Sequence, residues 1–189
     1  MSGVFDESPV LQGGTDNTSI GNFLDRLKVD ASINGNSLTN NNYLYSVALS
    51  INMASSSTNN PLILFRNPSG SGKVVRIKRI SCGVNINNVF ASFYVFHTPT
   101  VTTNGTSQTP VSTNIGGGAS AAVSLVTTLP TVSSTGTALA NGAVGQNSAS
   151  ITLTDNFDIY IQANQAILIT GAPSSNNREA VITVVWGEV

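Results

Sequence analysis

The segment Ser69-Gly70-Ser71-Gly72-Lys73 contains the residue types that end a phosphate-binding loop. Such a loop also needs a glycine five residues before its Gly-Lys pair and a Ser or Thr after the lysine, to hold magnesium. Those positions are Asn67 and Val74 here. The residues after Lys73 alternate like a strand, whereas the loop must lead into a helix N-terminus that receives the phosphate. We therefore interpret this segment as a solvent-exposed turn and predict no nucleotide site.

His97 and Cys82 are the only histidine and the only cysteine, so a nucleophile with a histidine base would have to be this pair. They lie on two predicted strands, which leaves their distance open. Cysteine is more often a small buried apolar residue, and we interpret His97 as the end of an apolar strand. Nucleophile elbows and rigid pairs of catalytic carboxylates are not evident. We predict no catalytic residue, no enzymatic activity and no cofactor.

The segment Asp155-Asn156-Phe157-Asp158 places oxygen ligands between two predicted strands, as calcium sites of some β-sandwich domains do. Asp and Asn are also among the commonest turn residues. A single cysteine excludes an internal disulfide and a cysteine-rich zinc site. We favour the turn and predict no metal site, with calcium as the alternative.

A basic stretch holds five of the eight positive charges with no acidic residue among them, namely Arg66, Lys73, Arg76, Lys78 and Arg79. The sequence pI of about 5.6 and the alternation of the stretch disfavour nucleic acid. A solvated strand face is the favoured interpretation. Pairing with an acidic partner surface, such as a neighbouring subunit's acid-rich arm, is the alternative. These five residues are therefore interface candidates.

Charge is scarce in this chain and unevenly placed. Hydrophobic residues make up 40% of the sequence and charged residues 9%, against about 25% charged in usual soluble domains. Residues 80–154 contain no Asp, Glu, Lys or Arg. Because soluble monomers keep mixed charge over their surface, this span favours a surface that is covered in an assembly. A neutral surface coated with Ser, Thr and Asn is the alternative.

The apolar pattern predicts short strands separated by turn clusters. The expected strands are Tyr43–Asn52, Pro61–Arg66, Lys73–Ile80, Val89–Phe96, Ala121–Thr127, Ala149–Leu153, Phe157–Gln162, Gln165–Thr170 and Ala180–Trp186. Strands at this spacing, with the Thr, Val, Ser and Asn content, are typical of a sandwich. We predict an all-β fold with a single antiparallel β-sandwich or jelly roll.

Residues 1–39 are predicted to form an extended N-terminal arm, and residues 40–189 the sandwich domain. The arm carries five of the nine acidic residues and has no sustained apolar run. Within it, Phe23, Leu24 and Leu27 would share one face of a short helix or belong to an extended strand, which we prefer. They are further interface candidates. The acidic start lacks the pattern of a signal peptide, and no segment is long and apolar enough for a membrane span.

An eight-residue segment, 99–106, recurs as 130–137, 31 positions later, with five of eight positions identical. Two copies do not make a solenoid. We predict two extended loops with the same chemistry, in which Gly105 and Gly136 permit positive φ and proline fixes the entry. The surrounding stretches, 99–118 and 130–147, are expected to be long connections.

Three segments together resemble a family of small structural proteins of tailed bacteriophages. They are 61–73, which ends in NPSGSGK, 96–106, which contains PTVTTNGT, and the closing strand 180–188 with its tryptophan. The resemblance covers about residues 61–189, and no functional residue carries over from it. It implies a β-sandwich that oligomerises on a virion, as a head decoration, or cement, protein does.

The expected function is therefore that of a virion structural protein that stabilises the capsid by binding major capsid subunits. Its partners would be the major capsid protein or other virion proteins. The chain is expected to form a homo-oligomer, with a trimer favoured. Neither nucleic acid nor a membrane is expected as a partner. It would be assembled in the host bacterial cytoplasm and reside in the virion. The alternative is a tail-fibre, tail-tip or receptor-binding module that contacts host surface glycan through the two long connections.

Overall fold

The computed structural model describes residues 44–54, 59–85, 90–113, 122–145, 150–154 and 157–189. Throughout these ranges the chain forms strands and turns without a helix, and the strands pair antiparallel. The prediction of an all-β antiparallel sandwich is confirmed. The proposed arm, with Phe23, Leu24 and Leu27, lies outside the described residues, so its role stays a prediction.

Sheet A is the first layer and is built around the long strands β1, β14 and β3. Its order is β11-β3-β14-β1-β7, and β12 also pairs with β3. The strands are β1 (Leu44–Met53), β3 (Val75–Val84), β7 (Val111–Ser112), β11 (Ser150–Thr152), β12 (Ile159–Ile161) and β14 (Arg178–Glu188).

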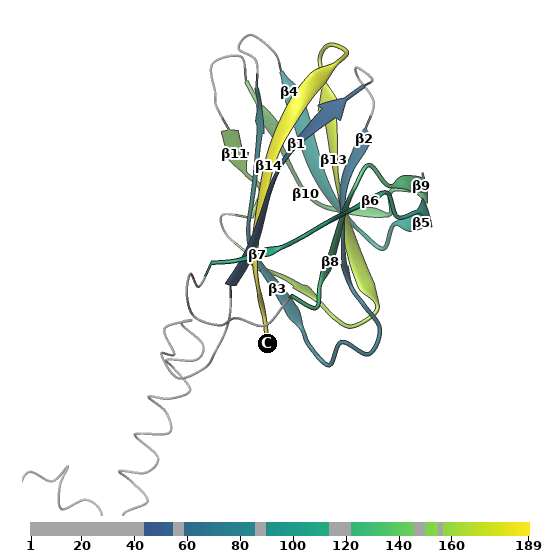
Figure 1. Ribbon diagram of the computed structural model, residues 1–189. Coiled ribbons are helices and arrows are strands. Elements are labelled where there is room, and N and C mark those ends of the chain that lie inside the picture. The colour runs from purple at the N-terminus through teal and green to yellow at the C-terminus, as the bar shows by residue number, and fades with distance from the viewer. Residues whose placement is uncertain (1–43, 55–58, 86–89, 114–121, 146–149, 155–156) are drawn as a thin grey trace, which may run out of the picture. The chain divides into compact units, whose positions relative to one another are not determined.

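Sheet B is the second layer and has the order β10-β4-β13-β2-β8-β6. Its strands are β2 (Asn60–Asn67), β4 (Ala91–His97), β6 (Thr106–Gln108), β8 (Leu125–Thr128), β10 (Thr137–Val144) and β13 (Gln165–Pro173). A separate pair, β5 (Thr100–Thr103) with β9 (Thr131–Ser134), forms a two-stranded ribbon. Figure 1 shows the two sheets as layers, with this ribbon projecting from sheet B on the side away from sheet A.

The inter-sheet core is made by alternate residues of both sheets, as the period of two in strands requires. Trp186 of β14 is fully buried and meets the edge of the Phe65 ring at a centroid distance of 4.9 Å. Tyr45 of β1 also stacks on Trp186, with the ring centroids 5.9 Å apart. Such aromatic pairs add about 0.5–1.5 kcal/mol each beyond their buried area. The core therefore joins the central strands of sheet A to β2 of sheet B.

Each of the nine strands expected from the sequence overlaps an observed strand, but the two long connections were predicted wrongly. The stretch 99–118 contains β5, β6 and β7, and 130–147 contains β9 and β10. These strands are rich in Thr, Ser, Gly and Asn, so they lack the alternating apolar pattern that marked the others. They are paired with distant strands, and of the five only β10 contributes side chains to the inter-sheet core, through Val144 and Ala140.

Candidate functional site

The repeated segments pair with each other, which accounts for the repeat. After β4 the chain turns at Thr98, and after β8 it turns at Leu129, with φ values of 53° and 52°. Proline follows each turn, and the two repeats then run antiparallel as β5 and β9, with Val101 opposite Val132. The two copies therefore form one reciprocal ribbon on sheet B rather than two separate loops.

The two glycines of the repeat close this ribbon at either end. Gly105 has a φ of 79°, and a Cβ there would overlap the carbonyl oxygen of Thr128 at the start of the opposite turn. Gly136 has a φ of 88°, and a Cβ there would overlap the carbonyl oxygen of His97. Each repeat thus needs glycine where it crosses the entry of the other, because any larger residue is excluded both by backbone conformation and by space.

Beneath the ribbon lies a second apolar cluster, separate from the inter-sheet core. Leu168 pairs with both Phe96 and Leu64, so the three residues form one row across sheet B. All three are buried, although the neighbouring Val95 and Phe65 are the ones that point into the inter-sheet core. Because successive side chains of a strand point to opposite faces, this row lies on the outer face of sheet B.

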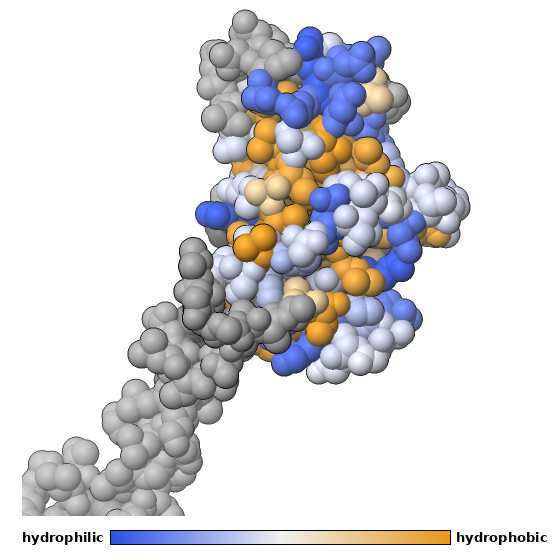
Figure 2. Space-filling model, viewed as in Figure 1, coloured by the Kyte–Doolittle hydropathy of each residue, from blue (hydrophilic) through white to orange (hydrophobic). Residues whose placement is uncertain are grey.

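β5 leads from β4 to β6 and β9 leads from β8 to β10, so the ribbon crosses the outer face of sheet B and makes a third layer there. Pro99 and Val101 line a cavity together with Arg66 of β2, and Asn104 lines another together with Leu64. The hydroxyl of Thr102 donates a hydrogen bond of 3.0 Å to the carbonyl oxygen of Thr131 within the ribbon. The surface of the ribbon consists of hydroxyls and small residues and appears pale at the right of Figure 2.

Sheet B is almost free of charge. Within its six strands, Arg66 is the sole charged residue, and the ribbon has none. The uncharged span 80–154 supplies four of those strands and both strands of the ribbon. Most of the charge-poor region of the sequence therefore lies in sheet B and the ribbon, while β7, β11 and the second half of β3 belong to sheet A.

The five basic interface candidates do not form one surface. Arg66 lies on the outer face of sheet B, whereas the other four come from β3 of sheet A and the turn before it. In β3 the pairing with β14 slips between Val185 and Trp186, leaving one extra β3 residue there. This bulge lets Ile77 and Ile80 both point inward while Lys78 and Arg79 remain at the surface.

Arg76 has its own acidic partner in the same chain. Its Nε donates a hydrogen bond of 2.8 Å to Oδ2 of Asp158, its Nη2 forms an ion pair with the same oxygen, and its guanidinium carbon lies 5.7 Å from the Tyr160 ring centroid. The hydrogen bond to Asp158 raises the pKa of Arg76. Lys78 has a lowered pKa, because partial burial and the nearby Arg76 disfavour its charge. Lys73 and Arg79 remain exposed.

Cys82 and His97 do not have the surroundings of a catalytic pair. Cys82 points into the inter-sheet core, and burial raises the pKa of its thiol to about 12. A thiol with that pKa stays protonated at neutral pH and is a poor nucleophile. His97 ends β4, beside the turn at Thr98, whose hydroxyl donates to the His97 carbonyl oxygen at 2.8 Å. The interpretation of Cys82 as a core residue is confirmed by its burial.

Glu188 is a buried acid with a structural role. Its carboxylate accepts hydrogen bonds from the backbone nitrogens of Val123 and Ser124 at 3.0 and 2.9 Å, from the Ser124 hydroxyl, and from Trp186 Nε1 at 3.3 Å. Several donors offset the cost of burying its charge. This carboxylate joins the end of β14 to the segment that leads into β8.

Among the described residues, no group of three or more His, Cys, Asp or Glu side chains is placed to hold a metal ion. Asp155 and Asn156 of the calcium alternative lie outside those residues. Asp158 is engaged by Arg76. The described part of the chain also contains no helix that is long and apolar enough to cross a membrane.

No family model and no curated protein matches the chain. Among solved structures, the structure of the infectious bursal disease virus Gx strain is 8% identical, with 78% of this chain and 37% of that chain covered. The TM-score is 0.10. A score this low carries no information on fold or function.

Proposed function

We propose that the chain is a non-enzymatic virion structural protein, a head decoration protein that stabilises a capsid by binding major capsid subunits. The observation that carries the proposal is the neutral side of the molecule, where the six strands of sheet B and the ribbon hold Arg66 as their sole charge. Interface cores are depleted in charged residues. A surface of this kind is suited to close packing against another protein, because few charges need to be desolvated.

The proposed mechanism is burial of area in a symmetric assembly. Sheet B and its ribbon would pack against a capsid subunit or around the axis of a trimer, while the N-terminal arm, 1–39, would add contacts to a neighbour. The charged β3 side, with Lys78 and Arg79 at its surface, would face solvent. No cofactor takes part in this mechanism.

Co-sedimentation with undecorated heads tests the proposal. The purified chain is mixed with heads assembled without it, and bound protein is quantified after sedimentation. We expect saturable binding with a fixed number of copies for each capsid subunit. Absence of binding at saturating concentration would overturn the proposal. Light scattering on the free protein tests the trimer separately.

The copy number of the chain in each particle separates the proposal from the tail alternative. A decoration protein is present in hundreds of copies, whereas a tail-fibre or receptor-binding module is present in a handful. The alternative rested on two long connections, and these contain strands β5 to β7 and β9 to β10. Hundreds of copies are expected.

A further inference from the structure

β10 is a long edge strand that carries neither a charge nor a proline. Within the described residues it pairs only with β4, and its eight residues include neither a charge nor a proline. The opposite edge of sheet B is β6, which has three residues. Natural sheets protect exposed edges by short strands, charges, proline or β-bulges, because an open edge accepts another strand. Of these devices β10 has a single bulge near its start. The long neutral edge of β10 is therefore a ready place for strand addition.

A bulge in β10 directs one apolar side chain at this edge. The pairing with β4 slips between Ala138 and Ala140, so Leu139 is the additional residue. Its side chain is 43% exposed and lines a pocket together with Phe157, which is 47% exposed. Bulges often re-aim a side chain toward a binding site. Two exposed large apolar residues meeting at one pocket are unusual for a solvated surface.

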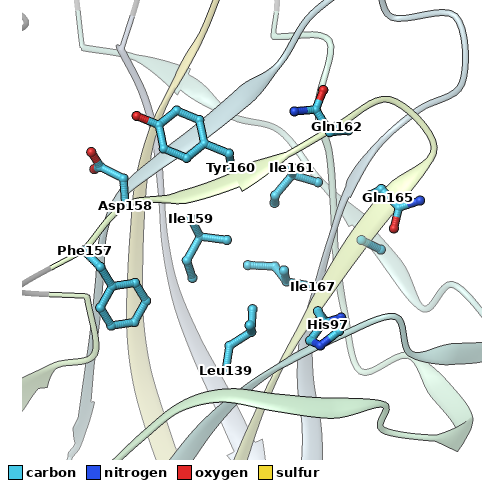
Figure 3. Close-up of a pocket in the computed structure, with 11 residues that line it drawn as sticks. His97, Leu139, Phe157, Asp158, Ile159, Tyr160, Ile161, Gln162, Gln165 and Ile167 are labelled. Carbon is cyan, nitrogen blue, oxygen red and sulfur yellow. The ribbon is translucent and has the colours of Figure 1, made fainter. Parts of the chain in front are cut away.

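The pocket lies between β10 of sheet B and β12 of sheet A and has a volume of about 360 Å³. Figure 3 shows Ile159 and Ile167 at its centre, with Leu139 and Phe157 on one side of them. Ile159 and Ile167 are buried. An apolar floor under a partly open mouth is typical of sites that receive one bulky apolar group.

The rim of the pocket offers hydrogen bonds and no net charge. Gln162 and Gln165 are exposed, and neither amide side chain forms a hydrogen bond within the part of the chain that the structure describes. Each amide has both donors and acceptors, as a peptide backbone has. Asp158 is neutralised by Arg76. The rim therefore matches the backbone of an uncharged segment rather than a charged ligand.

We infer that this edge binds an extended, uncharged peptide segment of a partner protein, which adds as a strand to β10 and inserts one bulky apolar side chain into the pocket. In this mode backbone hydrogen bonds supply affinity and a side-chain pocket supplies specificity. The site uses Leu139 and Phe157 at the edge and not the ribbon face. It does not depend on the proposed virion function.

A panel of labelled octapeptides tests the inference by fluorescence anisotropy. The peptides have the sequence Ser-Thr-Val-Thr-X-Thr-Val-Ser, with Phe, Leu, Trp, Ala or Asp at X. We expect saturable binding for Phe, Leu or Trp at X, at least tenfold tighter than for Asp. The best peptide with N-methylated backbone amides should bind at least tenfold more weakly, because it cannot pair as a strand.

Variants locate the site. Phe157→Ala and Leu139→Ser should each weaken binding at least tenfold, and Val181→Ser should leave it unchanged. Val181 is the matched control, because it is also 43% exposed but lies on β14 of sheet A. Melting curves verify that each variant is folded. Phe157 and Leu139 are both about half-exposed, so neither change removes a core residue.

Three results would overturn the inference. The first is that no peptide of the panel binds saturably, and the second is that Phe157→Ala and Leu139→Ser bind as the unchanged chain does. The third is that chito-oligosaccharides bind in a Phe157-dependent manner while the peptides do not, which would assign the pocket to glycan.

Discussion

The outer faces of the two sheets differ in charge and in burial. Sheet A carries its charges on β3 and β14, and the outer side of β14 exposes Val181 between polar neighbours. Sheet B carries Arg66 alone and buries an outer row under the ribbon, with Leu168 at its centre. Sheet A therefore resembles the surface of an ordinary soluble protein, whereas the outer face of sheet B is an additional core capped by neutral hydroxyls. This difference is the reason why we propose sheet B, rather than sheet A, as the side that contacts another protein.

The largest expected effect compares a buried residue beneath the ribbon with an exposed one on sheet A. Leu168→Ala should lower the free energy of unfolding by about 3 kcal/mol, as deletions in closed cores do. Val181→Ala should change it by less than about 0.5 kcal/mol, as surface changes do. Urea unfolding of both variants measures the difference. Equal small effects would show that the ribbon does not close over the outer row.

The closure of the ribbon can be tested at its glycines. Gly136→Ala should destabilise the fold by about 2 kcal/mol or more, because a Cβ there meets the His97 carbonyl and φ is positive. Gly70→Ala is the matched control, since φ is 74° but no atom lies within 4 Å of its Cβ. It should cost only the conformational penalty of about 1 kcal/mol. Urea unfolding that gave equal losses for the two variants would contradict the reciprocal packing of the repeats.

The ion pair on sheet A should contribute less than either feature of sheet B. A double-mutant cycle with Arg76→Leu and Asp158→Asn should give a coupling energy of about 1 kcal/mol or less, as partly exposed pairs do. That coupling should fall when salt is raised to 1 M. A coupling energy larger than the loss in the free energy of unfolding caused by Leu168→Ala would contradict the prediction that this ion pair contributes less than the outer row of sheet B.

The smallest effect is a pH dependence at Glu179 on sheet A. The Ser50 hydroxyl and the Asn85 amide lower the pKa of this exposed carboxylate in the folded chain. Its contribution to stability is therefore present above the ordinary glutamate pKa and is lost as pH falls through the lowered value. Glu179→Gln should lower Tm slightly at pH 7, and the difference should vanish at about pH 2. A larger difference at low pH would contradict this sign.

Strands with an apolar face could be predicted from the sequence, and strands without one could not. Val75 and Ile77 alternate with Arg76 and Lys78, which marks β3 locally. β5 and β9 lack this alternation of apolar and polar residues, because they pair with each other and lie on the outer face of sheet B. The repeat was the only feature of the sequence that indicated their pairing. Two Pro-to-Gly segments of equal length and similar composition are able to pair antiparallel, but pairing between distant segments is not encoded in local periodicity.

The candidate sites show the same limit. The sequence places Arg66 in one group with the basic residues of β3. The turn after β2 leads from sheet B to sheet A, so Arg66 lies on a different sheet from the other basic residues. Asp158, the partner of Arg76, lies 82 residues away in the sequence. The pocket at Leu139 and Phe157 joins strands of different sheets, and the bulge that aims Leu139 has no sequence signature. Neither the Arg76–Asp158 ion pair nor the pocket shared by Leu139 and Phe157 could be predicted without knowing the strand order.

One pair of variants tests the claim that the neutral side is the assembly surface most directly. Thr100→Glu places a charge on the ribbon, and Ala48→Glu places the same charge on an exposed position of β1 in sheet A. Co-sedimentation with undecorated heads is measured for both. The account predicts that Thr100→Glu reduces binding at least tenfold while Ala48→Glu binds as the unchanged chain does. Full binding by Thr100→Glu, with loss in Ala48→Glu, would contradict it.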